Sequence, residues 1–283
     1  MKTALRALGL AACLAAGSAH AQLGLSPSYL DLGEAEARRT QVFRVTNFGD
    51  QPVHVRTELA AFDIDARGEV AETAPNERSL ERHLVISPIE FDIPARGSQA
   101  VRLALRPSGA LVAGEYRGVV YFRLGAAASL GEGSQLPISY RLGGAVYVQV
   151  GEPVRTAVLE DIDTTDGREI GFSLRATGSA NARLHGRYAV WRKGAWGNGQ
   201  PLPPLPQENK PVPDGLVMNG ALPGRPVLPG HRVRYATPLS QDEQRLPPGD
   251  YVVHVVGGLE QESIERVIPF HVAPARGDAA HAR

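Results

Sequence analysis

Cysteine is nearly absent from this chain, and charge of either sign is not in excess. The 283 residues contain one cysteine, Cys13, so an internal disulfide and a zinc site of several thiolates are both excluded. Lys and Arg together number 30, as do Asp and Glu. A nucleic-acid-binding domain usually carries a clear basic excess, so no nucleic-acid partner is expected.

Long apolar runs are missing beyond the amino terminus. Residues 1–21 combine Lys2 and Arg6 with an Ala/Leu/Gly-rich run ending in Ala19-His20-Ala21, a pattern typical of a secretory signal peptide cleaved after Ala21. A lipoprotein attached through Cys13 is the minor alternative, because the apolar run before that cysteine is short. No later run of about eighteen apolar residues exists, so no membrane span is expected.

Motifs that carry catalysis or metal binding are also missing. The sequence has no GxSxG, no HExxH and no glycine-rich phosphate loop. Residues 63–68 resemble part of a calcium loop, but Arg67 and Ala74 stand where ligands are needed. The histidines are scattered. We therefore expect no enzyme, no metal and no cofactor.

The pattern of residues along the chain indicates an all-β protein. Short β-branched runs are separated by turns with Gly, Pro, Asn and Asp, and no long helical periodicity appears. Residues 41–59 read as two strands around Asn47-Phe48-Gly49-Asp50. Residues 100–105 and 116–124 read as further strands.

An internal repeat predicts two domains. "PARGSQAVRLAL…AGEYRGVVYF" is matched by "LPGHRVRYATPL…PPGDYVVHVV". In each copy a tyrosine, Tyr116 or Tyr251, stands where an immunoglobulin-like sandwich places its tyrosine corner. We expect two immunoglobulin-like β-sandwiches in tandem, and Trp191 would be a core tryptophan of the second. The expected ranges are 1–21 for the signal peptide, 22–151 and 152–274 for the sandwiches, and 275–283 for a disordered tail.

Residues 197–229 form a proline-rich segment with hardly any strand pattern. The main interpretation is a long surface loop joining two strands. The alternative is a docking segment for another protein.

The stretch from Ser134 to Pro153 has the alternation of an unusually long strand. Val146, Val148 and Val150 would face the core of the first sandwich, and Gly143-Gly144 suggests a bulge or bend before them. The apolar residues that come earlier on the same strand are Leu136, Ile138, Tyr140 and Leu142.

Five segments, taken in order, resemble a known family. They are "LGLSPSYLDL", "VFRVTNFGDQPVHVR", "LVISPIEFDIPARGSQAVRLAL", "GEYRGVVYFRL" and the long strand. Together they are similar to the first domain of the periplasmic pilus-assembly (fimbrial) chaperones, a two-domain immunoglobulin-like family. The resemblance covers about residues 23–150, and the second domain matches mainly in architecture.

The resemblance implies a periplasmic chaperone that lends a strand to a pilus or fimbrial subunit. The donor residues would be Leu136, Ile138, Tyr140 and Leu142. The alternative is that all of them simply face the home sheet. The family also implies an outer-membrane usher as a second partner.

The same family carries a basic pair in the cleft between the domains, which grips the terminal carboxylate of the subunit. Alignment places Tyr29 and Ala145 at those positions, and neither is basic. Arg141 or Arg123 is a possible substitute.

Two other functions stay open. One is a structural or adhesive component of a surface fibre, although only residues 22–26 precede the first strand, too few for a donor extension. The other is a periplasmic ligand-binding module, which would need an aromatic-lined site, whereas only 6% of residues are aromatic.

Overall fold

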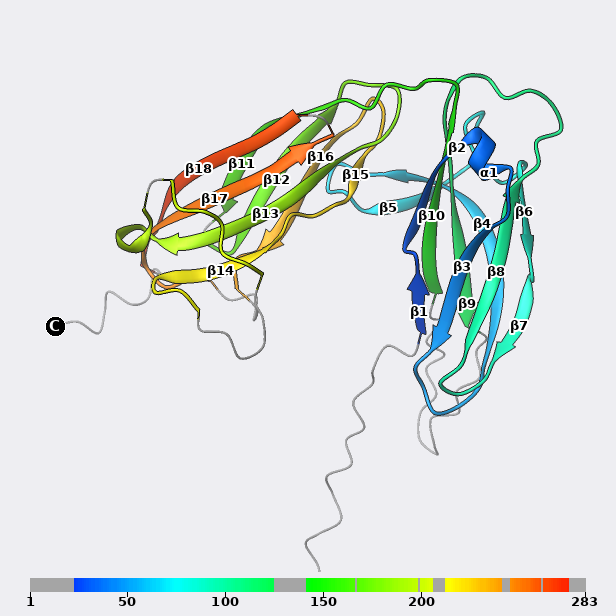
Figure 1. Cartoon of the computed structure of the whole chain (residues 1–283), viewed down its shortest axis with the longest axis horizontal. Helices are drawn as coiled ribbons and strands as arrows, with labels where there is room; N and C mark the ends of the chain where they lie inside the picture. The colour runs from blue at the N-terminus through cyan, green and yellow to red at the C-terminus, as the bar shows by residue number, and fades with distance from the viewer. Residues whose placement is uncertain are drawn as a thin grey trace, which may run out of the picture.

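The computed structural model describes residues 23–124, 141–165, 167–197, 199–205, 212–240, 245–260 and 262–274. They form two β-sandwiches in tandem that meet at an angle (Figure 1). In this described part, the helical pieces are the short helix α1 (Glu34–Ala37) and the 3-10 turn η1 (Lys193–Ala195). The expected all-β fold of two immunoglobulin-like sandwiches in tandem is confirmed.

The first sandwich is built from strands β1 to β10. Its four-stranded sheet has the order β1-β3-β8-β6, with β1 (Leu23–Ser26), β3 (Gln41–Asn47), β8 (Ser98–Leu105) and β6 (Leu84–Ser87). Its six-stranded sheet has the order β2-β10-β9-β4-β5, with β7 paired to β4. The bounds are β2 (Tyr29–Gly33), β10 (Arg141–Val150), β9 (Gly114–Leu124), β4 (Val53–Ile64), β5 (Val70–Thr73) and β7 (Glu90–Ile93).

The second sandwich is built from strands β11 to β18. Its three-stranded sheet has the order β11-β12-β16, with β11 (Ala157–Thr165), β12 (Glu169–Ala176) and β16 (Arg232–Pro238). The other sheet has the order β14-β13-β17-β18, with β15 paired to β13. The bounds are β14 (Leu216–Ala221), β13 (Ala182–Arg192), β17 (Gly249–Leu259), β18 (Glu262–Val272) and β15 (Pro226–Val227).

Residue alternation explains the core of the first sandwich. Phe43 and Val45 on β3 and Val55 on β4 are fully buried, as the period of two predicts. Burying a side chain of this size contributes about 1.5–3 kcal/mol.

The two tyrosine corners are built alike. The hydroxyl of Tyr116 accepts a hydrogen bond from the backbone N–H of Val112 at 3.1 Å, four residues upstream. The hydroxyl of Tyr251 donates to the carbonyl of Pro247 at 2.7 Å, also four residues upstream. Each phenol thus holds the chain as it enters the last inner strand of its sandwich.

Trp191 refines one expectation. It is buried, yet it belongs to neither core cluster. Its neighbour Val190 points into the core of the second sandwich, whereas Trp191 lies opposite Val252 on the outer face of β13 and β17. Trp191 is thus a buried tryptophan of the second sandwich, as expected, but alternation puts it on the other side of its strand from the cluster between the sheets.

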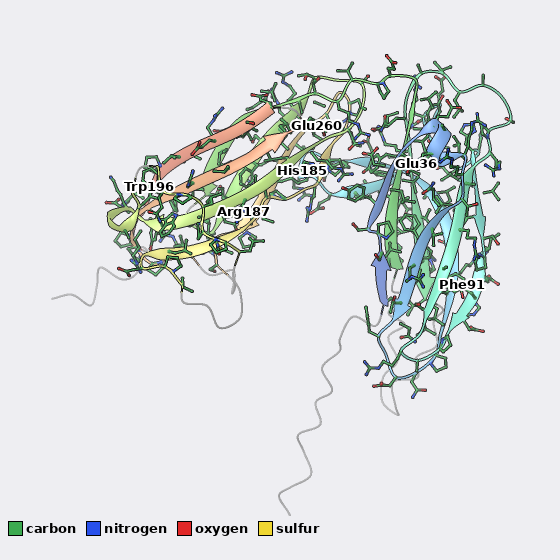
Figure 2. The ribbon with its side chains drawn as sticks, in the orientation of Figure 1. Glu36, Phe91, His185, Arg187, Trp196 and Glu260 are labelled. Carbon is green, nitrogen blue, oxygen red and sulfur yellow. The ribbon has the colours of Figure 1, made fainter. Side chains whose placement is uncertain are left out.

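The proline-rich segment is docked, in its described part, on this same outer face. Arg187 Nη1 donates to the carbonyl of Pro203 at 3.1 Å, and Asn219 Nδ2 donates to that of Pro204 at 2.6 Å. Trp196 lies edge-on to His254, at 6.2 Å between ring centroids. Figure 2 shows Trp196 at the end of the second sandwich that is remote from the first. These contacts favour a surface loop held against its own sandwich.

Residues 197–229 also contain two strands that the sequence did not indicate. β14 pairs with β13 from Arg187 opposite Ala221 to Trp191 opposite Leu216, and β15 pairs with β13 over two residues. β14 is short and includes Asn219 and Gly220, which are poor strand formers. Pairing with a long neighbouring strand outweighs this weak local preference.

Candidate functional site

β10 lies between β9 and β2 in the six-stranded sheet. Its register against β9 runs unbroken from Arg141 opposite Arg123 to Val150 opposite Gly114. β2 pairs with it, in parallel, only from Ala145 to Gln149. The described part of β10 therefore has a paired half (Ala145–Gln149), bonded on both edges, and an open half (Arg141–Gly144). Among the described strands, the open half has a sheet partner on the β9 side alone.

The side chains of β10 alternate between two environments. Val146 and Val148 are fully buried in the core of the first sandwich, and Leu142 is half-buried against the same core. Tyr147 points the other way and belongs to an apolar cluster that includes residues of the second sandwich. The even-numbered residues thus share one face. The candidate donor residues Leu136, Ile138 and Tyr140 lie outside the described residues.

Gly143 and Gly144 do not mark a bulge, because the register against β9 passes through them without a shift. A Cβ on Gly144 would come within 2.8 Å of the ring of Phe43 and 3.0 Å of Leu25. A Cβ on Gly143 would lie 3.1 Å from Tyr121. The glycines are explained instead by the close approach of side chains to both faces of the strand.

The two cleft positions expected from the resemblance are direct neighbours. Tyr29 on β2 is the register partner of Ala145 on β10. Tyr29 is 39% exposed, and the guanidinium carbon of Arg183 lies 3.9 Å from the centre of its ring. Arg183 comes from β13, at the end of the second sandwich that faces the first. A cation therefore stands against Tyr29, and it is supplied by the other sandwich.

Arg183 is almost fully buried at this junction. Its Nη1 donates to the carbonyl of Gly224 at 2.9 Å, while Nε and Nη2 have no hydrogen-bond partner among the described residues. Its guanidinium carbon also lies 5.3 Å from the ring centre of Tyr147. Burial raises the pKa of the Tyr147 hydroxyl, and the positive charge of Arg183 opposes that rise. Cation–π contact with two rings is what stabilises this guanidinium.

The bases suggested as substitutes at the cleft are engaged elsewhere. Arg141 forms an ion pair with Glu72 of β5 and stacks over the ring of Tyr121, 4.1 Å from its centre. Arg123 forms an ion pair with Glu58 at 3.1 Å. Both arginines lie on the face of the six-stranded sheet that points away from the core of the first sandwich.

A polar network joins the two sandwiches beside this cleft. Oε2 of the buried Glu115 accepts hydrogen bonds from Gln149 Nε2 at 2.9 Å and from the backbone N–H and Nδ2 of Asn181 at 2.8 and 2.7 Å. Arg155 in the linker holds Asp31 through two bonds, at 2.7 and 2.5 Å. Charged hydrogen bonds of this kind are the strong ones.

Asp31 titrates below the usual range because of this network. Burial would raise its pKa, but hydrogen bonds and charge from Arg155, with further hydrogen bonds from Asn181 and Gln149, lower it overall. Sequence reasoning missed this network. Its one signal was Gln149, a polar residue between the apolar Val148 and Val150.

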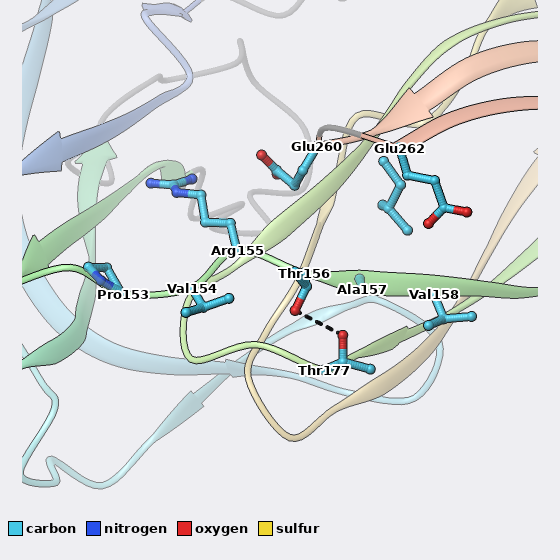
Figure 3. Close-up of a pocket in the computed structure, with 10 residues that line it drawn as sticks. Pro153, Val154, Arg155, Thr156, Ala157, Val158, Thr177, Glu260 and Glu262 are labelled. Carbon is cyan, nitrogen blue, oxygen red and sulfur yellow. Dashed lines mark hydrogen bonds between the residues drawn. The ribbon is translucent and has the colours of Figure 1, made fainter.

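A groove of about 670 Å³ opens next to the network, along the linker and the start of β11 (Figure 3). Arg155 and Glu260 line it, with Thr156 bonded to Thr177 on its floor at 3.0 Å. The exposed Val154 also lines it.

No group of three or more potential metal ligands occurs among the described residues. Within the same residues, no helix is long and apolar enough to cross a membrane.

Comparisons with known proteins give structural neighbours only. No family model matches the chain, and no curated protein matches it. Solved structures that resemble it include the class 5 fimbriae chaperone CfaA, with 14% identity over 89% of this chain and 100% of that one, at a TM-score of 0.43. The YadV chaperone has 10% identity over 88% and 100%, at 0.44.

A third neighbour is a chain of the CsuC–CsuE chaperone–tip adhesion subunit complex of Acinetobacter baumannii. It has 14% identity over 88% of this chain and 98% of that one, at a TM-score of 0.41. The chain is thus structurally similar to several fimbrial chaperones.

Proposed function

We propose that this protein is a periplasmic chaperone that caps an exported pilus or fimbrial subunit by lending it the amino-terminal part of the long strand that ends in β10. The observation that carries the proposal is the open half of β10. Where a strand has a sheet partner along one edge only, the N–H and C=O groups of its other edge are unpaired. They can then pair with a strand of another chain.

The apolar residues before and within the open half fit this role. Leu136, Ile138, Tyr140 and Leu142 keep the period of two that fills successive pockets on one face of a partner. Burying four such side chains contributes up to roughly 6–12 kcal/mol, at about 1.5–3 kcal/mol each and before ordering costs. The paired half of β10 meanwhile anchors the donor strand in the first sandwich.

Partners and release follow from the resemblance. A subunit that lacks one strand of its sandwich would expose its apolar core until the chaperone fills the gap. A neighbouring subunit's strand would later replace the chaperone's strand at an outer-membrane usher. Release then needs no nucleotide.

We further propose that Arg183 is the cation that holds the subunit's terminal carboxylate in the cleft. Positions 29 and 145, where the family is basic, are Tyr and Ala, and Arg141 and Arg123 are already in ion pairs. Nε and Nη2 of Arg183, the pair of donors that matches a carboxylate, are buried and have no hydrogen-bond partner among the described residues. The ring of Tyr29 must turn aside to admit it.

The test is capture of a client from a periplasmic extract of the native host. Tagged wild type is compared with an Ile138→Asp/Tyr140→Asp double variant. We expect a small exported β-rich protein to co-purify with wild type and to be lost, by more than tenfold, from the variant. Circular dichroism checks that the variant is folded.

Val256→Asp/Val267→Asp is the matched control, since both valines are exposed on the second sandwich. It must retain the client. If the donor-strand variant captures the same protein as wild type, the strand belongs to the home fold and strand donation is wrong. Arg183→Gln should weaken capture of a client with a free terminal carboxylate and leave capture of its carboxamide form unchanged.

A further inference from the structure

The outer face of the four-stranded sheet differs from the rest of the surface. Alternation along β3, β8 and β6 identifies the side chains that point away from the core. They are small or apolar apart from two arginines: Val42, Arg44, Thr46, Ser98, Ala100, Arg102, Ala104, Val85 and Ser87. Arg106 follows β8 directly at the rim. We call this surface the arginine face, and the outward side chains of its strands include no acid.

Two arginines of this face are hydrogen-bonded to uncharged groups among the described residues. Arg44 Nη1 donates to the hydroxyl of Ser98 at 3.2 Å. Arg106 Nη1 donates to the carbonyl oxygens of Arg38 and Leu105 at 2.6 and 2.7 Å. None of Arg44, Arg102 and Arg106 is ion-paired to a carboxylate of the described residues, and all three are exposed.

The three-stranded sheet of the second sandwich provides the contrast within the same molecule. On its outer face, Glu160 lies between Arg175 and Arg232, at 2.6 and 2.7 Å. Arg234 is held between Asp163 and Glu169, at 2.6 and 2.8 Å. On the three-stranded sheet, these arginines thus form ion pairs with carboxylates of the same face. On the arginine face, the outward side chains of the strands include no carboxylate that could pair with the arginines.

We propose that the arginine face is a docking surface for an acidic protein partner, whose Asp and Glu side chains supply the missing carboxylates. Arg binds carboxylates through two parallel hydrogen bonds and is enriched in protein interfaces. The small Ser, Ala and Thr side chains between the arginines leave a flat surface that a folded partner can approach closely. The positive charge of this face, which no carboxylate of the face balances, indicates that the partner is acidic.

A membrane or a nucleic acid fits this face less well. Recognition of anionic lipid usually takes four to eight basic residues at about 1 kcal/mol each, and this face has three. The exposed large apolar side chains on or beside it are those of Val42, Phe48 and Val85, which are fewer than the continuous apolar face of a surface that inserts into a bilayer. Nucleic-acid binding needs a broad basic surface, which a chain with balanced charge does not provide.

The location makes this partner separate from the proposed client. The arginine face belongs to the sheet β1-β3-β8-β6, whereas β10 belongs to the other sheet of the same sandwich. Figure 1 shows β3 and β8 in a different layer from β9 and β10. The acidic partner and the client of β10 would therefore contact different sheets of this sandwich.

The experiment places a photo-crosslinking amino acid, p-benzoylphenylalanine, at Ala100 or Ala104 in the full chain within the native host. Irradiation should give an adduct with another protein, and mass spectrometry should map the crosslink to a segment rich in Asp and Glu. Arg44→Glu/Arg102→Glu should reduce the adduct at least tenfold. The same variant should capture the client of β10 as wild type does.

Arg168→Glu/Arg266→Glu is the control with the same change of charge, at exposed positions of the second sandwich, and it should change the adduct by less than twofold. A crosslinker at Ser173, on the three-stranded sheet, should not give this adduct. The proposal is overturned by an adduct with lipid or with a second copy of this chain, by the absence of any adduct, or by a protein adduct that the Arg44→Glu/Arg102→Glu change leaves intact.

Discussion

The two halves of β10 have the same alternation of apolar residues but different surroundings. In the paired half, Val146 and Val148 are fully buried and the backbone is bonded to β9 and β2. In the open half, Leu142 is only half-buried and the strand pairs with β9 alone among the described strands. Neighbouring strands, and not the alternation, decide which half is structural and which is free to bind a partner.

The largest expected loss of stability comes from a substitution in the paired half of β10. Val148→Asp places a charge in a fully buried apolar site, which should cost more than about 4 kcal/mol of the free energy of unfolding. Ile138→Asp, in the proposed donor segment, should change it by less than about 0.5 kcal/mol. Urea unfolding followed by circular dichroism measures both. Equal losses for the two variants would remove the distinction between the halves.

The next effect concerns the junction that holds the paired half against the second sandwich. Asn181→Ala removes the Nδ2 bonds to Glu115 at 2.7 Å and to Asp31 at 3.3 Å. Losing bonds to buried carboxylates should cost about 1.5–3 kcal/mol. Asn219→Ala, whose Nδ2 bonds an exposed carbonyl at Pro204, is the control and should cost less than about 1 kcal/mol. The urea midpoints of the two variants test this order.

A smaller effect separates the two faces of the open half. Gly144→Ala brings a methyl group within 2.8 Å of Phe43, which is fully buried, and should cost about 1–3 kcal/mol. Gly143→Ala meets Tyr121 at 3.1 Å on the other face, where the ring has more room to shift, so the loss should be smaller. Thermal unfolding compares them, and a larger loss for Gly143→Ala would contradict the packing described here.

The smallest effect is a pH dependence at the junction. The pKa of Asp31 is lower in the folded protein than the ordinary value, so its ion pair stabilises the fold at neutral pH. That stability is lost as pH falls below about 4 and through the lowered pKa. Asp31→Asn should therefore be less stable than wild type at pH 7, and the difference should shrink at pH 3. A difference that stays constant would show that the charge of Asp31 is not what stabilises the junction.

Much of the fold could be predicted from local patterns. Alternation identified the buried residues of β3 and of the paired half, and the repeat identified Tyr116 and Tyr251. The outer-face position of Trp191 and the strand β14 could not be predicted, because both depend on which residues lie across a neighbouring strand. A short weak strand becomes regular when a long partner supplies its hydrogen bonds.

The cleft shows the same limit. Tyr29 and Ala145, the two positions that the alignment assigned to the cleft, are register partners on β2 and β10, and both lie on strands with a clear pattern. Arg183 is 154 residues from Tyr29 in the chain, and nothing in its local sequence indicates that it stacks on that ring. The same is true of Asn181 and its bonds to Glu115.

The sequence by itself determined the all-β fold class and which face of each strand is buried, because side-chain alternation is a local property with a period of two. Only the tertiary structure decided which strand edge stays open, which arginines find carboxylates and which cation stands in the cleft. Those outcomes depend on contacts between segments far apart in the chain, and no local pattern encodes which segments will meet.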